Sequence, residues 1–122
     1  MSNPMRHFQS EEFDCKCGCD ATGDKMKMVL LSRLDAARDM AGFPFHITSG
    51  MRCEAHNAAV GGSRISSHLD GWAVDIAVPG DTERFFMLHH LYLAGFRRIG
   101  ISASFIHVDV DPAKVAYRSW VY

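Results

Sequence analysis

The chain has 122 residues, 48% of them hydrophobic and 22% charged, and its formal net charge is -1 at pH 7. These values are typical of a single globular domain over residues 1–122, and they give no reason to expect binding to nucleic acid or to an anionic membrane. The apolar runs are short, and the N-terminus lacks the apolar core of a secretory signal. We therefore expect a monomer without membrane insertion that is cytoplasmic as synthesised and acts elsewhere only after release.

The first segment, residues 1–23, is predicted to be an irregular arm rather than a separate domain. Within the arm, residues 10–13 resemble a short capped turn that places Phe8 and Phe13 against the body of the protein.

Hydrophobic periodicity and turn residues predict mixed helices and strands in the rest of the chain. Asp24 is the expected cap of the first helix and Gly42 marks its end, while Phe85, Leu88 and Tyr92 form the expected buried stripe of the last helix. The order of the elements predicts an α+β fold with a small, largely antiparallel sheet and flanking helices. Helices are expected over 24–40, 54–60 and 79–93, and strands over 45–48, 72–78, 98–101 and 105–110, with a final strand or packed cover over 117–122.

Two predicted strands carry polar residues on the face that points away from the core. Apolar residues alternate along 72–78, and this alternation places Asp75 on the opposite face. The same pattern in 105–110 places His107 and Asp109 away from the core. The polar residues of both strands are thus predicted to lie outside the core.

His68, Asp75 and His107 are candidate ligands of a catalytic metal. Taken alone, each residue is also consistent with an ordinary capping, surface or structural role. Together, two imidazoles and one carboxylate suit zinc, and three protein ligands leave a fourth position for water. The combination therefore predicts a Zn²⁺ site.

Arg52 follows a predicted strand, where binding residues often collect. Its planar, charged guanidinium suits a peptide carboxylate or the oxyanion formed when a carbonyl is attacked. The alternative is a surface arginine in an ion pair. Ser67, which precedes His68, and Phe105, two residues before His107, are further candidates for substrate binding. Ser67 is expected to donate a hydrogen bond rather than to act as a nucleophile.

Four cysteines, at positions 15, 17, 19 and 53, leave three interpretations open. Free thiols are expected in a reducing cytoplasm, and a disulfide to Cys53 becomes plausible after export. The spacing of Cys15 and Cys19 is compatible with a structural zinc knuckle.

Segments 67–75 and 105–109, preceded by 48–52, resemble the zinc D-alanyl-D-alanine carboxypeptidase family. The resemblance is closest to short phage and bacterial members, and it extends to the cysteine-bearing arm and to 57–62. It implies the fold shared with lysostaphin-type peptidases and the hedgehog signalling domain.

The resemblance also implies a function and a set of site residues. The expected activity is hydrolysis of peptidoglycan stem peptides or cross-links, of the DD-carboxypeptidase or endopeptidase type, including the endolysins of phage or prophage lysis. By position, His68, Asp75 and His107 would be the zinc ligands, and Arg52 would match the substrate-binding arginine.

The resemblance departs from the family pattern at one catalytic position. Many members have an acidic residue, which acts as the general base, three positions before the last ligand histidine, but this chain has Ser104 there. Asp109 is a candidate replacement, because residue i+2 on a strand points to the same side as His107. Alternatively, Asp109 orients a ligand histidine or pairs with a cation. The alternative function is a non-catalytic, zinc-holding module that binds peptidoglycan or serves as a phage structural component.

Overall fold

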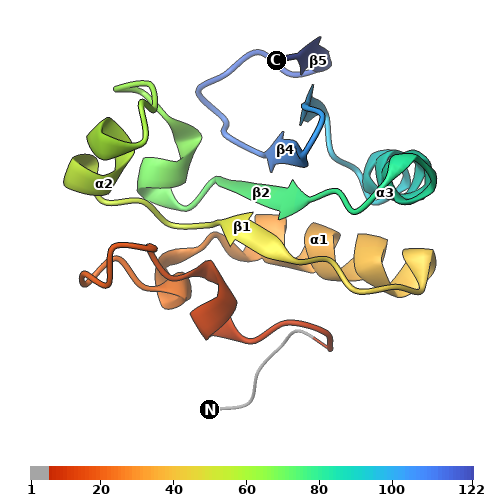
Figure 1. Cartoon of the computed structure of the whole chain (residues 1–122), viewed down its shortest axis with the longest axis horizontal. Coiled ribbons are helices and arrows are strands. Elements are labelled where there is room, and N and C mark those ends of the chain that lie inside the picture. The colour runs from red at the N-terminus through yellow and green to blue at the C-terminus, as the bar shows by residue number, and fades with distance from the viewer. Residues whose placement is uncertain (1–5) are drawn as a thin grey trace.

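The computed structural model describes residues 6–122, in which three α-helices accompany one five-stranded sheet (Figure 1). The strand order is β1-β2-β4-β3-β5, and all neighbouring strands are antiparallel except β3 and β5. The predicted α+β class with a largely antiparallel sheet is confirmed. The elements are η1 (Ser10–Phe13), η2 (Gly23–Lys25), α1 (Met28–Ala41), β1 (Ile47–Ser49), α2 (Glu54–Ala59), η3 (Ser67–Asp70), β2 (Ala73–Ala77), α3 (Asp81–Leu93), β3 (Arg98–Ile101), β4 (Phe105–Asp109) and β5 (Arg118–Val121), where η denotes a short 3₁₀ turn.

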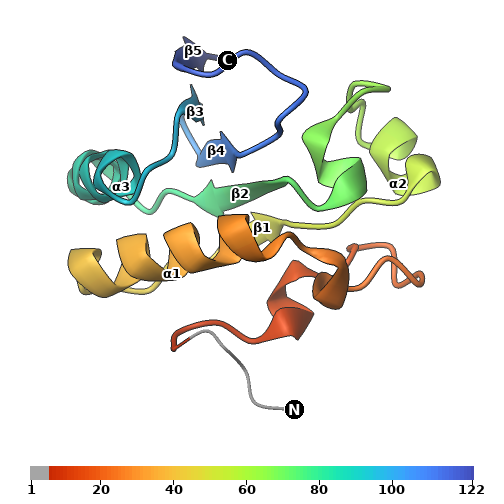
Figure 2. The same cartoon turned by 180° about the vertical axis from the view of Figure 1, so that it is seen from behind.

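One face of the sheet is buried in the hydrophobic core. Figure 2 shows α1 in front of β1 and below β2, and α1 also packs against α3. Val74 and Ile76 of β2 and Ile106 and Val108 of β4 are fully buried on this face. The predicted alternation is therefore correct for both strands, and the opposite face is left for polar residues.

The first helix begins later than predicted. Asp24 is not its cap, because Asp24 lies in η2, where its carboxylate accepts a hydrogen bond from the Thr22 hydroxyl. Met26 then adopts an extended conformation and places its side chain in the core, which separates η2 from α1. The predicted end is confirmed, because Gly42 terminates α1 in the left-handed conformation, with φ of 78°.

The last helix buries a different stripe from the predicted one. Met87 and Leu91 are fully buried, whereas Phe85 and Tyr92 are exposed and Leu88 only packs at the edge of the core. Both sets of residues have helical spacing, so packing against α1 decides which set is buried. Within residues 6–122, neither α3 nor another helix is long and apolar enough to cross a membrane.

The N-terminal arm is part of the core, as predicted for its two phenylalanines. Phe8 and Phe13 are both fully buried, with ring centroids 5.5 Å apart. The carbonyl of Phe13 accepts a hydrogen bond of 2.8 Å from the backbone N–H of Met51. Gly50 permits this approach, because a Cβ at its position would lie 2.8 Å from the Phe13 Cα. The arm thus packs directly on the segment that follows β1.

Truncation of Phe13 tests this packing. Phe13→Ala is expected to lower the free energy of unfolding by about 3–5 kcal/mol, because it leaves a cavity in the core. The matched control, Phe85→Ala on the exposed side of α3, is expected to change it by less than about 0.5 kcal/mol. Urea unfolding followed by circular dichroism measures both values, and equal midpoints would contradict the placement of the arm.

Candidate metal centre and its cleft

The pairing of β2 with β4 brings two of the predicted ligands together. Asp75 and His107 are directly opposite each other in the antiparallel register, on the face away from the core. His68 comes from η3, which ends at Gly71 in the left-handed conformation, with φ of 77°. A Cβ on Gly71 would lie 2.5 Å from the carbonyl oxygen of Lys25, so this close turn requires glycine. The turn leads the chain directly into β2.

The three predicted ligands have the spacing of a metal site. Asp75 Oδ1 lies 2.9 Å from His107 Nδ1 and 3.3 Å from His68 Nε2. One ligand atom from each residue lies within 4.8 Å of the other two, and all three residues are buried. A tetrahedral zinc ion with bonds of about 2.0–2.2 Å separates its nitrogen and oxygen ligands by about 3.4 Å. These residues can therefore hold a divalent metal ion.

Each histidine is oriented by a partner outside the group. His68 Nδ1 lies 2.8 Å from the carbonyl oxygen of Gly50, and His107 Nε2 lies 2.8 Å from Asp109 Oδ2. Each partner accepts a hydrogen bond from one ring nitrogen and so directs the other nitrogen toward Asp75. Such partners determine the tautomer and ring orientation of metal-bound histidines.

Asp109 is engaged through both of its carboxylate oxygens. Oδ2 bonds to His107, and Oδ1 accepts a hydrogen bond of 2.8 Å from Arg98 Nε. Only 1% of Asp109 is exposed. Arg98 is held in turn over the ring of Trp120, 5.0 Å from its centroid. This geometry favours the interpretation in which Asp109 orients a ligand histidine and pairs with a cation.

The electrostatics of the group suit a bound cation. Burial acts to raise the pKa of Asp75, but hydrogen bonds from His107 and His68 outweigh it, and the net pKa lies well below its usual range. Burial acts to lower the pKa of His107, but hydrogen bonds to Asp109 and Asp75 reverse this, and the net pKa is raised. Metal binding at His107 requires an unprotonated Nδ1, so a bound ion would compete with a proton there.

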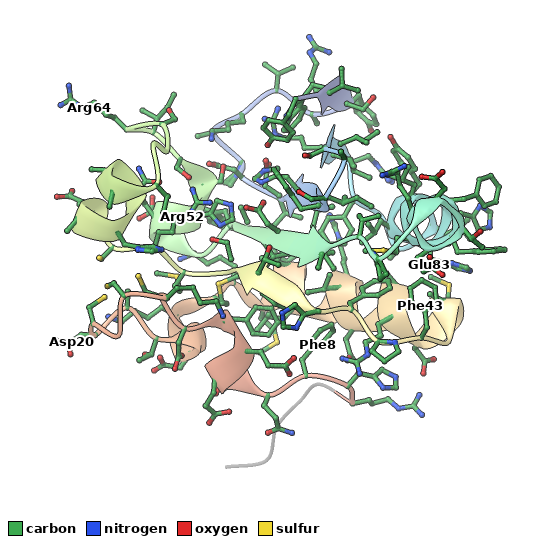
Figure 3. All side chains as sticks on the ribbon, in the orientation of Figure 1. Phe8, Asp20, Phe43, Arg52, Arg64 and Glu83 are labelled. Atoms are coloured by element: carbon green, nitrogen blue, oxygen red, sulfur yellow. The ribbon has the colours of Figure 1, made fainter. Side chains whose placement is uncertain are left out.

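Arg52 extends from the segment after β1 toward the same group. Its Nη2 lies 3.3 Å from Asp75 Oδ2, and its Nε donates to Ser49 Oγ at 3.1 Å. Its Nη1 donates to Asn57 Oδ1 at 3.3 Å. Figure 3 shows Arg52 pointing inward beside η3, whereas Arg64 extends outward from the tip of its loop. The structure thus places the predicted arginine beside a predicted ligand.

Asn57 is a site residue for which the sequence predicted no role. It is buried in α2, where its Oδ1 accepts from Arg52 and its Nδ2 donates to the carbonyl oxygen of Ser63 at 2.8 Å. A Cβ at Gly62 would lie 2.1 Å from Asn57 Oδ1, so this packing requires glycine. The only signal in the sequence was the resemblance over 57–62, which includes both residues.

The group opens into a cleft of about 360 Å³, which Ser67 and Phe105 help to line. Ser67 Oγ donates to Asp111 Oδ2 at 2.9 Å and accepts from Lys114 Nζ at 2.8 Å. The ring of Phe105 lies 5.1 Å from that of Tyr122. Both predicted substrate-binding residues therefore lie at the cleft, and Ser67 is already bonded to its wall.

Trp120 lines the cleft with its aromatic ring, although the sequence predicted no role for it at the site. Its ring centroid lies 5.7 Å from that of His107. Gly100 on the neighbouring strand makes room for it, because a Cβ there would lie 2.6 Å from Trp120 Nε1. The tail was predicted only as a strand or a cover, and β5 confirms the strand.

Ser104 does not face the metal group. It is exposed, its carbonyl accepts a hydrogen bond of 2.9 Å from the Val78 N–H, and it does not line the cleft. Among the residues described, the carboxylates that line this cleft are Asp75 and Asp109. Asp75 is a candidate ligand and Asp109 is engaged on both oxygens, so neither carboxylate is free to act as a base in this arrangement.

Comparison with known proteins agrees with this geometry. The family profile described as Peptidase M15 matches residues 6–109. The match begins in the N-terminal arm, ends at the last residue of β4 and includes all three candidate ligands. No curated protein matches the chain. Because the matched segment covers most of the sequence, the chain belongs to the peptidase M15 family, whose members are metal-dependent peptidases.

Proposed function

We propose that this protein is a zinc-dependent peptidase that hydrolyses peptide bonds in the stem peptides or cross-links of peptidoglycan. The observation that carries the proposal is the convergence of His68, Asp75 and His107 at a cleft that also holds Arg52. Family membership supports a peptidase, and the resemblance of 67–75 and 105–109 to D-alanyl-D-alanine carboxypeptidases supports the substrate class. Their short phage members suggest cell lysis as the setting.

His68, Asp75 and His107 would hold the zinc ion, and the open side of the group would receive the substrate. Bound zinc lowers the pKa of water to about 7 and polarises the scissile carbonyl. Arg52 would bind the substrate carboxylate or the oxyanion with its forked guanidinium. Its hydrogen bonds to Ser49 and to the α2 side chain Asn57 hold that guanidinium in position before substrate arrives.

We assign Asp109 a positioning role. Its Oδ2 would accept a hydrogen bond from the Nε2–H of His107 and so leave Nδ1 for the metal. Arg98 balances the charge of this buried carboxylate. Such an arrangement raises the basicity of the ligand histidine without placing Asp109 in contact with the substrate.

The principal experiment measures the release of new amino groups from purified peptidoglycan. We expect release by the zinc-loaded protein, none after chelation, and recovery when zinc is restored. His68→Ala is expected to reduce release to the metal-free background, because it removes a ligand. His89→Ala, an exposed histidine on α3, is the matched control and is expected to retain full activity.

Mass spectrometry of the released products names the bond that is cut. Loss of one terminal residue would indicate a carboxypeptidase, and separation of linked stems would indicate an endopeptidase. Absence of any release by folded, zinc-loaded protein would overturn the proposed activity.

Arg52→Ala tests the substrate-binding assignment. We expect kcat/KM to fall by about 10²–10³-fold, because a preorganised donor to the developing charge is lost. Zinc content is expected to be unchanged, since Arg52 is not a ligand. The matched control is Arg64→Ala, at the exposed tip of its loop. An equal kcat/KM for both variants would remove Arg52 from the site.

Asp109→Asn separates positioning from base catalysis. A positioning role predicts that zinc affinity falls by about 10–100-fold and that saturating zinc restores most of kcat. A base role predicts unchanged affinity and a kcat that excess zinc does not restore. Competition with a chelating dye measures the affinity, and exposed Asp70→Asn serves as the control.

One observation favours a second candidate function. Within residues 6–122 the cleft offers no free carboxylate, because Asp75 is a candidate ligand, Asp109 is hydrogen-bonded through both oxygens, and Ser104 lies outside the cleft. A protein with this site could hold zinc and bind peptidoglycan without cutting it. Zinc-dependent co-sedimentation with intact peptidoglycan, without release of amino groups, would favour this binding module.

A further inference from the structure

All four cysteines of the chain lie together at a point formed by the arm and the start of α2. The Sγ atom of Cys15 lies 3.4 Å from that of Cys17 and 3.9 Å from that of Cys53, and Cys17 and Cys53 are 3.6 Å apart. The sulfur of Cys19 belongs to the same group, whose four sulfur atoms all lie within 4.8 Å of one another. Four thiols thus point at one common centre.

These separations match a metal site rather than disulfides. A disulfide requires an S–S distance of about 2.05 Å, so each of the measured pairs would have to approach by roughly 1.5 Å. A tetrahedral zinc ion with Zn–S bonds of about 2.3 Å separates its sulfur ligands by about 3.8 Å. Two disulfides would also use the sulfurs in separate pairs, whereas the observed arrangement is a single cluster.

We propose that Cys15, Cys17, Cys19 and Cys53 form a second zinc site, with four thiolate ligands and a structural role. Four protein ligands leave no open position for water, so this site is not catalytic. It shares no ligand with the candidate metal centre.

The backbone around the cluster is arranged as in a preformed thiolate site. The N–H of Ala21 donates to Cys19 Sγ at 3.4 Å, and the N–H of His56 donates to Cys53 Sγ at 3.3 Å. Such bonds stabilise the charged thiolate, which is the form that binds metal. Gly18, with φ of 81°, turns the chain between Cys17 and Cys19, so that both can face the same centre.

The position of the cluster indicates which segments of the chain a bound metal ion would connect. Three ligands come from the arm, and the fourth, Cys53, is the N-cap of α2 and follows Arg52 directly. Figures 1 and 2 both show the loop of the arm lying beside the start of α2. A zinc ion here would connect the arm to the helix that carries Asn57. It would therefore stabilise the segment that positions Arg52.

Cobalt substitution of the wild-type protein tests the proposal without any variant. The candidate metal centre offers only nitrogen and oxygen ligands, so thiolate-to-Co²⁺ charge-transfer absorption in the near ultraviolet can come only from the cysteines. We expect this absorption in the Co²⁺-loaded protein, prepared under reducing conditions, and its loss on addition of zinc. Cys19→Ser replaces an exposed ligand and is expected to weaken or abolish it.

Zinc analysis by mass spectrometry gives a second readout. We expect about two zinc ions per wild-type chain, and about one in either His68→Ala or Cys19→Ser, because each variant removes a ligand from a different site. In zinc-loaded His68→Ala, the four thiols are expected to be protected from a thiol-reactive dye and to become reactive after chelation. Ser32→Ala, an exposed substitution in α1 away from both sites, is the control for zinc content.

Three results would overturn the proposal. Reduced, Co²⁺-loaded protein without charge-transfer absorption would exclude thiolate ligation. Four thiols that react freely in the zinc-loaded protein would identify ordinary free cysteines. An intact mass that shows disulfides in protein purified without reductant, together with no zinc bound to His68→Ala after reduction, would assign the cluster to disulfide formation. The Co²⁺ absorption and the thiol protection report on the cysteines alone, so failure of the peptidase proposal would not alter these two readouts.

Discussion

The antiparallel pairing of β2 with β4 is the constraint on which the site depends. Its register places Asp75 directly opposite His107, and the two-residue period of a strand turns both side chains away from the core. Val74 and Val108 are paired in the same register and are buried on the other face. A slip of one residue would turn the carboxylate and the imidazole into the hydrophobic core and turn these valines out of it. Core packing and ligand placement are therefore specified by the same pairing.

The candidate ligand histidines are held by buried groups that would not themselves contact a metal ion. The carbonyl of Gly50 and the carboxylate of Asp109 each accept a hydrogen bond from one histidine. Gly50 also lies against the arm residue Phe13, which is part of the core. The orientation of His68 is thus connected to the packing of the N-terminal arm. The packing of the arm therefore helps to hold the candidate ligands in one arrangement.

The sequence was sufficient to predict which side chains of each strand point away from the core. It was not sufficient to predict which residues of neighbouring strands those side chains contact. Alternation along two segments correctly placed Asp75 and His107 away from the core, because side-chain direction follows from strand period alone. His68 lies outside any strand, and only its combination with the other two and the family resemblance identified it. The engagement of Asp109 by Arg98 depends on which strand lies next to β4, and local spacing does not contain this information. The prediction of the buried stripe of α3 was wrong for a similar reason, because two sets of residues in that helix have the same helical spacing.

The wall of the cleft formed by β5 differs in construction from the rest of the site. β5 lies at the edge of the sheet, pairs only with β3 and has no fully buried residue. The connection that leads to it is attached beside the metal group through the polar contacts of Ser67 with Asp111 and Lys114. Segments with few buried apolar contacts have the smallest free energies of local opening. The side of the cleft built on the core strands β2 and β4 is therefore expected to have a higher free energy of local opening than the side formed by β5. Local opening of the cleft is therefore expected to begin on the β5 side and to leave the three candidate ligands in place.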